Sequence, residues 1–184
     1  MSTPWKLAAT GGVGILAGVA LVSVDWTLAS LAAFTGLALV ARGALHLVTS
    51  TPFLGLAGAF AVLEVAGDVG IGITALAWPE PTLLSLAVVI GSWAILHAIV
   101  GATIAVTTRA ENRQWALSIL FALIAVALGA ILIARAEESV HTAAVIIGLL
   151  ALLEGTREVV EAAFRQRRER RFRRAAHDHS AAAS

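Results

Sequence analysis

The sequence predicts an all-α fold: a polytopic membrane helix bundle with six transmembrane helices, arranged as three tandem two-helix hairpin repeats. Three observations support this prediction. The chain is 59% hydrophobic and 14% charged, whereas soluble domains are about 45–50% apolar and about 25% charged. Its apolar residues form six runs, each close to the ~20 residues that cross a bilayer as a helix. One pattern of small and polar residues also recurs three times along the chain.

Short segments with turn-forming or charged residues separate the six apolar runs. These separators contain Asp25, Pro52, Pro81, Arg109 or Glu137, which are residues that interrupt an apolar helix. Connections this short predict antiparallel helical neighbours. The predicted spans are 6–24, 28–49, 54–77, 82–107, 115–134 and 140–162.

The charges near the span ends predict the orientation. Lys6, Arg109 and the Arg-rich C-terminus fall on one side of the predicted bundle, while Asp25 and Glu80 fall on the other. Because Lys and Arg are enriched in cytoplasmic loops, the first side is expected to be cytoplasmic, with both termini inside. Most Trp residues fall at the predicted membrane boundaries. Trp93 is the exception, since it lies well within a span.

An internal repeat of about 55 residues is the strongest single signal. Gly36, Gly91 and Gly148 coincide when its three copies are aligned, and each copy follows a short outer turn, "VDWT", "PEPT" or "AEES". Each unit contains two spans, so all three units share one orientation. The aligned segments are "TLASLAAFTGLALVARGALH" (27–46), "TLLSLAVVIGSWAILHAIVG" (82–101) and "SVHTAAVIIGLLALLEGTRE" (139–158).

The predicted organisation follows from the repeat. Six spans form one transmembrane domain, and an Arg-rich cytoplasmic tail follows it. The transmembrane domain is 1–163, with repeats at about 5–50, 54–108 and 114–162, and the tail is 164–184.

These glycine-marked hairpins, with short outer turns that contain acidic residues or Pro79 and Pro81, resemble the HdeD-like acid-resistance membrane proteins. The resemblance covers about residues 5–162. It implies a six-helix, multi-pass protein of the bacterial-type inner (plasma) membrane, linked to acid or envelope stress. It implies no established activity and supplies no catalytic motif.

A buried polar layer is predicted inside the bundle. Glu64 and Asp68 lie in a long apolar run and, at spacing i,i+4, share one helix face. Arg42, His97 and Glu154 occupy one column of the repeat alignment, on three other spans. Counted inward at 1.5 Å per residue, these side chains lie roughly 10–20 Å from the cytoplasmic helix ends. Charge at that depth is unfavourable unless the side chains face the bundle interior and are compensated there.

Two readings of this layer remain open. In the first, it is a static polar network that holds the three hairpins together. In the second, it handles protons or ions, since Glu64, Asp68 and Glu154 outnumber the single fixed cation, Arg42. On the second reading Glu64 pairs with Arg42, and Asp68 is the member expected to be protonated at neutral pH. His46, one turn beyond Arg42, is expected near the inner interface rather than as a ligand.

The segment "FRQRRERRFRR" (164–174) is expected to continue the last helix and to contact anionic lipid headgroups. Glu–Arg pairs at i,i+4 favour the helical continuation. Nucleic-acid binding is not predicted. The seven residues expected at the headgroups are Arg165, Arg167, Arg168, Arg170, Arg171, Arg173 and Arg174.

The sequence carries no recognisable enzyme motif, so a non-enzymatic protein is predicted, with no cofactor and no metal site. The principal function hypothesis is a membrane stress or acid-resistance protein that shapes the membrane or holds partners. The alternative is a small proton-coupled transporter or channel that uses Glu64, Asp68 and His97. The lipid bilayer is the expected partner, and a homo-oligomer or a membrane-protein partner remains open.

Overall fold

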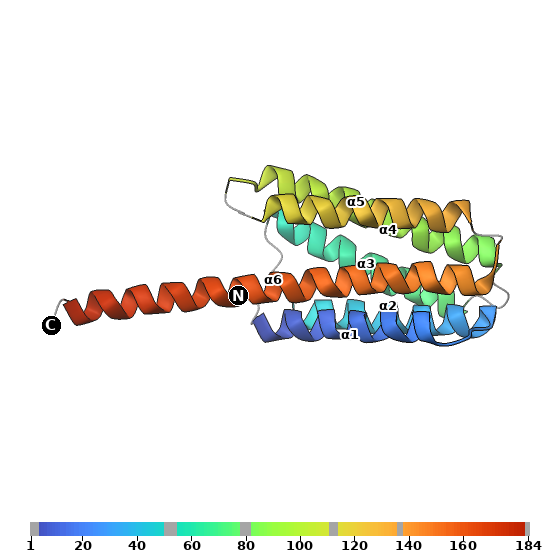
Figure 1. The fold of residues 1–184 in the computed structure, drawn as a ribbon, viewed down its shortest axis with the longest axis horizontal. Helices are drawn as coiled ribbons and strands as arrows, with labels where there is room; N and C mark the ends of the chain where they lie inside the picture. Colours follow the sequence, from blue (N-terminus) through green and yellow to red (C-terminus); the bar gives the residue numbers. More distant parts are fainter. Residues whose placement is uncertain (1–3, 50–54, 78–81, 111–113, 136–137, 183–184) are drawn as a thin grey trace.

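The computed structural model of the chain describes residues 4–49, 55–77, 82–110, 114–135 and 138–182, and its regular elements over these ranges are all helices (Figure 1). The bounds of these helices match the predicted spans to within two residues, except that the last helix is longer. The six helices of the described ranges are α1 (Pro4–Ser23), α2 (Leu28–Thr49), α3 (Gly55–Ala77), α4 (Leu83–Thr107), α5 (Trp115–Ala134) and α6 (Val140–Ala182).

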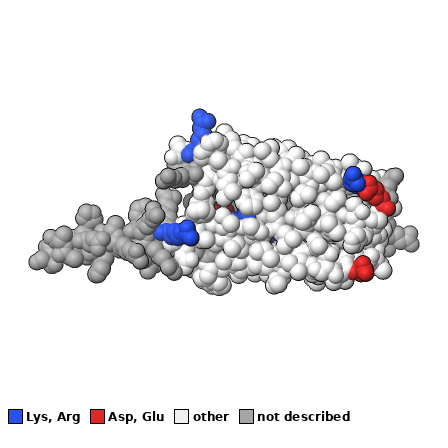
Figure 2. Space-filling view, viewed as in Figure 1, with Lys and Arg blue, Asp and Glu red and all other residues white. Residues whose placement is uncertain are grey.

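Four of the described helices are long and apolar enough to cross a membrane: Leu28–Val48, Gly58–Ala77, Leu83–Thr107 and Trp115–Ala134. The apolar part of α1 is shorter, Leu7–Ser23. Large apolar side chains face outward along these helices, and Leu16 and Leu123 are 72% and 63% exposed. On the face shown in Figure 2, the described charged side chains gather at the two ends, apart from a small opening onto charged atoms inside. Such a surface is suited to lipid and indicates an integral membrane protein.

Helix α6 extends far beyond the other helices. It has 43 residues, and its C-terminal half projects from the bundle (Figure 1). Ala162, which is 2% exposed, is the last buried residue of α6 among the described side chains. The predicted continuation of the last helix through 164–174 is therefore confirmed.

The same N-terminal cap recurs at the start of α2, α4 and α6. The backbone N–H of Ser30 donates to Thr27 Oγ1 at 3.3 Å, and that of Ser85 donates to Thr82 Oγ1 at 3.1 Å. The backbone N–H of Thr142 donates to Ser139 Oγ at 3.0 Å. Each cap satisfies a backbone donor that the first helical turn leaves without a partner. The polar turns noticed in the sequence therefore have a structural role in every repeat.

Three glycine pairs bring neighbouring helices into close contact. They are Gly18 with Gly148, Gly36 with Gly72, and Gly91 with Gly129. A Cβ atom on any of these six glycines would lie 2.7–2.9 Å from the carbonyl oxygen of its partner glycine. In lipid, where no hydrophobic effect drives helices together, such close backbone packing is a main source of association.

The most extensive helix pairs are α1 with α6, α2 with α3, and α4 with α5. Each glycine pair lies in one of them, so each close pair joins helices of successive repeats, and the last helix packs on the first. The two helices of each expected hairpin pack less extensively against each other. The repeated units are thus linked into a ring.

The tightest apolar packing lies near the N-terminal ends of α2, α4 and α6. Leu31, Ala87 and Ala144 are fully buried there, and Ala32 is 2% exposed. All four belong to one contiguous cluster of buried residues. The small alanines let these three helices converge, which closes this end of the bundle interior.

The two glycines Gly91 and Gly101 of α4 provide a matched test of the close approach. A Cβ at position 91 would meet Gly129 O at 2.8 Å and Ile133 Cγ1 at 2.7 Å, whereas one at position 101 would meet nothing within 4 Å. We expect Gly91→Ala to destabilise the bundle by about 1–3 kcal/mol through overpacking. Gly101→Ala should be neutral or slightly stabilising, since Ala is the better helix former. Unfolding of the purified protein in detergent measures both, and equal stabilities for the two variants would contradict the packing argument.

Candidate functional site

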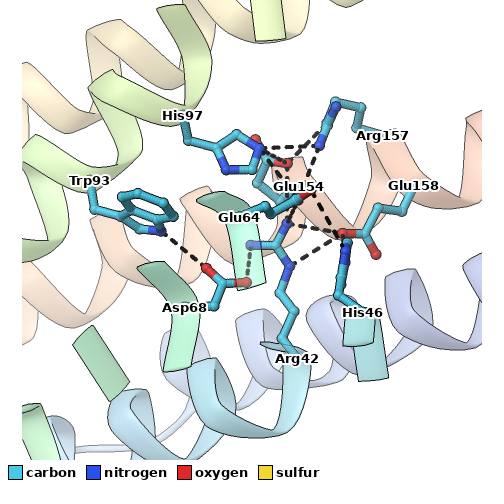
Figure 3. Close-up of polar contacts among 9 residues, drawn as sticks. All are labelled: Arg42, His46, Glu64, Asp68, Trp93, His97, Glu154, Arg157 and Glu158. Atoms are coloured by element: carbon cyan, nitrogen blue, oxygen red, sulfur yellow. Dashed lines mark hydrogen bonds and ion pairs between the residues drawn. The ribbon is translucent and has the colours of Figure 1, made fainter. Parts of the chain in front are cut away.

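Eight ionisable side chains from four helices meet in the interior, and we call them the ionic cluster (Figure 3). They come from α2, α3, α4 and α6. Glu64, His97 and Glu158 are 7%, 7% and 2% exposed, and Asp68 is fully buried. The members are Arg42, His46, Glu64, Asp68, His97, Glu154, Arg157 and Glu158.

The guanidinium of Arg42 lies at the centre of the cluster, within 4 Å of four carboxylates. Its Nη2 lies 3.0 Å from Glu158 Oε1 and 3.2 Å from Glu64 Oε1. It also approaches Glu154 Oε2 at 3.7 Å, while Nη1 lies 3.4 Å from Asp68 Oδ2. A planar guanidinium with five donors is suited to such multiple pairing. Arg42 therefore ties α3 and α6 to α2.

Arg157 is the second fixed cation and links α6 to α4. Its Nε donates to Glu154 Oε2 at 2.9 Å, and its Nη2 lies 3.3 Å from His97 Nε2. A guanidinium only donates, so a hydrogen bond between these two nitrogens requires His97 to accept through an unprotonated Nε2. His97 Nε2 also lies 3.6 Å from Glu64 Oε1.

The side chain of His46 lies between two carboxylates. Its Nε2 is 3.2 Å from Glu158 Oε1, and its Nδ1 is 3.7 Å from Glu64 Oε2. The residue is 9% exposed and lies one turn before the end of α2 at Thr49. It is therefore close to the end of its helix, as expected from the sequence, but its side chain turns into the bundle and joins the cluster.

Trp93 holds the deepest carboxylate. Its indole N–H donates to Asp68 Oδ1 at 3.0 Å, as Figure 3 shows. The ring occupies the space beside Gly67, where an added Cβ would overlap it. The absence of a side chain at Gly67 thus lets an indole from α4 reach a carboxylate on α3. This explains the unusual position of Trp93 in the middle of a span.

The cluster is asymmetric, although the frame that carries it is repetitive. When Gly18, Gly72 and Gly129 are aligned, Gly14 and Ala125 occupy the positions equivalent to Asp68. Arg42, His97 and Glu154 share one column of the internal alignment, so one cation, one imidazole and one carboxylate stand at aligned positions. The side chains at these aligned positions differ and complement one another.

The charges of the cluster do not balance when both imidazoles are neutral. It contains four carboxylates and two guanidiniums, which leaves two uncompensated negative charges. Among the described residues, Asp68 Oδ2 and Glu158 Oε2 are buried carboxylate oxygens with no hydrogen-bond partner. Asp68 Oδ2 still faces Arg42.

A cavity of about 110 Å³ lies next to the cluster, along the interior faces of α1, α2, α4 and α6. Its walls are mainly aliphatic, and Arg42, His97 and Glu154 line one end of it. Thr35 lines the wall further along α2, and its buried Oγ1 has no hydrogen-bond partner in the described part of the chain. The cavity lies between the ionic cluster and the tightly packed alanine end of the bundle.

The five side chains predicted for the buried layer all lie in the cluster: Arg42, Glu64, Asp68, His97 and Glu154. Arg157 and Glu158 were not among the residues predicted for this layer. A signal was available for Glu158, because it shares a repeat column with His46 and lies one turn beyond Glu154.

The Arg-rich tail lies apart from the cluster, on the projecting part of α6. Of its seven Arg side chains, the structure describes Arg167, which is exposed and lies 6.0 Å from the centroid of the Phe164 ring. The structure does not describe the side chains of the other six, which are Arg165, Arg168, Arg170, Arg171, Arg173 and Arg174.

Comparison with known proteins identifies the repeat. The family model for a short repeat of unknown function (DUF308) matches the chain twice, over residues 66–134 and 120–177. The double match agrees with the internal repeat in the sequence. No curated protein and no solved structure matches the chain.

Replacing Arg42 tests the role of its guanidinium. Arg42→Met keeps much of the side-chain volume but removes the cation that faces four buried carboxylates, so we expect a loss of about 3–5 kcal/mol in stability. Arg135→Gln is the matched control, because the Arg135–Glu138 pair is exposed and such pairs contribute about 0.5 kcal/mol or less. Denaturant unfolding in detergent gives both values. A loss for Arg42→Met as small as that for the control would refute a central role.

Proposed function

We propose that this chain, which belongs to the family of the short repeat of unknown function (DUF308), is a non-enzymatic membrane protein of the acid- or envelope-stress type. In this role it would be similar to the HdeD-like proteins. In this proposal all six helices span a bacterial-type inner membrane as three hairpin repeats, with both termini in the cytoplasm. The protein acts by forming a persistent scaffold in the bilayer that holds a partner or shapes the surrounding lipid.

One observation carries this proposal: every member of the ionic cluster lies within 4.0 Å of an oppositely charged or hydrogen-bonding partner. Breaking one buried pair leaves an uncompensated charge, which is strongly unfavourable in a low-dielectric interior. The cluster therefore favours one arrangement of α2, α3, α4 and α6 over alternatives. Such a network suits a scaffold better than a catalytic site, because each carboxylate already faces a guanidinium.

A small proton-coupled transporter or channel is the second candidate. The cavity supports this second candidate. Arg42, His97 and Glu154 line one end of the cavity, so a solute inside it would contact ionisable groups. Intramembrane ionisable residues of this kind often mark ion or substrate pathways. Glu64 and Asp68 would then be the groups that exchange protons with the pathway.

Two measurements on the same protein separate these functions. If the protein is a scaffold, we expect expression of the wild-type chain in an acid-sensitive bacterium to improve survival of an acid shock. Arg42→Met should abolish this gain, because it weakens the bundle.

Proteoliposomes that contain the protein and a pH-sensitive dye should show no proton flux above that of empty vesicles. Flux that is lost in Asp68→Asn would establish the transporter instead. Equal survival with and without the wild-type chain would contradict the stress role.

The direction of α6 refines the expected lipid contact. If α6 leaves the bilayer along its own axis, Arg167 lies about 7 Å beyond Ala162 and Arg174 about 18 Å beyond it. The attraction to anionic headgroups falls off over a Debye length of ~10 Å at 0.1 M salt. The residues nearest the membrane are therefore proposed to provide most of the contact.

We expect replacement of Arg165, Arg167 and Arg168 by Gln to reduce the anionic lipid that remains bound to the full-length protein. Replacement of Arg171, Arg173 and Arg174 is the matched control, with the same charge change further from the bilayer. Native mass spectrometry of protein from phosphatidylglycerol-containing nanodiscs counts the bound lipids. Equal losses in the two triple variants, or lipid binding that does not weaken with salt, would contradict this arrangement.

A further inference from the structure

Three side chains at the inner part of the cluster converge from three helices. His46 of α2, Glu64 of α3 and Glu158 of α6 each offer one ligand atom, and these atoms lie within 4.8 Å of one another. Nitrogen and oxygen ligands around a zinc-sized ion sit at ~2.1 Å from it, and so roughly 3–3.5 Å from one another. Small rotamer adjustments would therefore bring all three atoms onto one ion.

The surroundings of these three residues are short of positive charge. Arg42 and Arg157 together balance two of the four carboxylates. Arg157 pairs with Glu154 at 2.9 Å, and Arg42 is shared among Glu158 at 3.0 Å, Glu64 at 3.2 Å and Asp68 at 3.4 Å. With neutral imidazoles, two of these last three carboxylates remain uncompensated. At least one of the convergent residues Glu64 and Glu158 therefore carries uncompensated charge.

The carboxylates that lack positive charge are buried, so their charge must be compensated from within the protein. Glu64 and Glu158 are 7% and 2% exposed, so water compensates little of their charge. Glu158 Oε2 is buried and has no hydrogen-bond partner among the described residues. A buried carboxylate that is left partly unsatisfied calls for a further ligand or ion. This observation is independent of the convergence of the three side chains.

We propose that His46, Glu64 and Glu158 form a binding site for one divalent transition-metal cation of the Zn²⁺ or Mn²⁺ class. One imidazole nitrogen with two carboxylate oxygens is a mixed ligand set that such cations accept, whereas Mg²⁺ prefers oxygen alone. A divalent cation supplies two positive charges, which is the deficit of the cluster. Three protein ligands leave a coordination position for water.

The rest of the cluster accommodates the cation. Arg42 contacts Glu158 through Nε and Nη2, and Glu64 through Nη2, so a cation there would compete with both nitrogens. The contact of its Nη1 with Asp68 at 3.4 Å remains available to hold the guanidinium. His46 lies one turn before the end of α2 at Thr49. The site is therefore close to the end of the bundle from which α6 projects, where a cation can arrive from water.

Metal titration of the full-length protein tests the proposal. All proteins are prepared without a metal-binding tag and with His177 and His179 replaced by Ala, so that the tail contributes no imidazole. After treatment with a chelator, isothermal titration with Zn²⁺ is expected to show one ion per chain, and His46→Gln and Glu158→Gln are each expected to weaken binding at least tenfold. His141→Gln, at the opposite end of α6, should bind as the parent does. Mg²⁺ should not raise the thermal stability, whereas Zn²⁺ should.

Mn²⁺ provides a spectroscopic readout that begins with the folded parent protein. In pulsed electron paramagnetic resonance, Mn²⁺ bound to the parent protein should show coupling to one imidazole nitrogen, and this coupling should vanish in His46→Gln but persist in His97→Gln. Absence of nitrogen coupling in the parent overturns the site. Coupling that depends on His97 instead, or Zn²⁺ binding that is unchanged by His46→Gln, also overturns it. A parent protein that binds no Zn²⁺ would leave His46 as a hydrogen-bonding residue only.

Discussion

The interior of this protein depends on the Arg42 guanidinium and the four carboxylates around it. In a bilayer, a buried carboxylate has no water to compensate it, so each one needs a cation or a donor nearby. Arg42 lies within 3.0–3.7 Å of all four. The two helices that carry these carboxylates, α3 and α6, must therefore pack where Arg42 can reach them. The position of α2 relative to both follows from this one side chain.

That convergence is possible because the backbones approach closely at three glycine pairs. Gly36 and Gly72 bring α2 against α3, and Gly18 and Gly148 bring α6 against α1. A larger side chain at any of them would push the helices apart and lengthen the ion pairs that cross the bundle. The repeat thus provides a geometric frame with equivalent contacts in each unit. The chemistry is confined to positions at which the units differ, such as Arg42, His97 and Glu154.

The sequence was sufficient to predict the helices and most of the cluster. Helix bounds follow from the length of the apolar runs, and charged residues inside such runs, such as Asp68, are conspicuous. Glu158 was missed because it lies near the end of a span, where charge is ordinary. The close pairing of α6 with α1 could not be predicted, because a glycine column indicates close packing but does not identify the partner helix. Which oxygen of Glu158 lacks a partner depends on rotamers, which no sequence pattern specifies.

The packing of the interior also limits how a solute could reach the ionic cluster. Beyond the cavity, Ala32, Ala87 and Ala144 are buried together near the N-terminal ends of α2, α4 and α6. Opening that end would separate three helices that the glycine pairs hold against α3, α5 and α1. Towards the side of the projecting α6, the interior is filled by ion pairs, which can exchange partners, although Gly11 and Gly155 also hold α1 against α6 there. Solute access from that side therefore begins with side-chain motion, whereas passage through the whole bundle also requires the ring of helices to open.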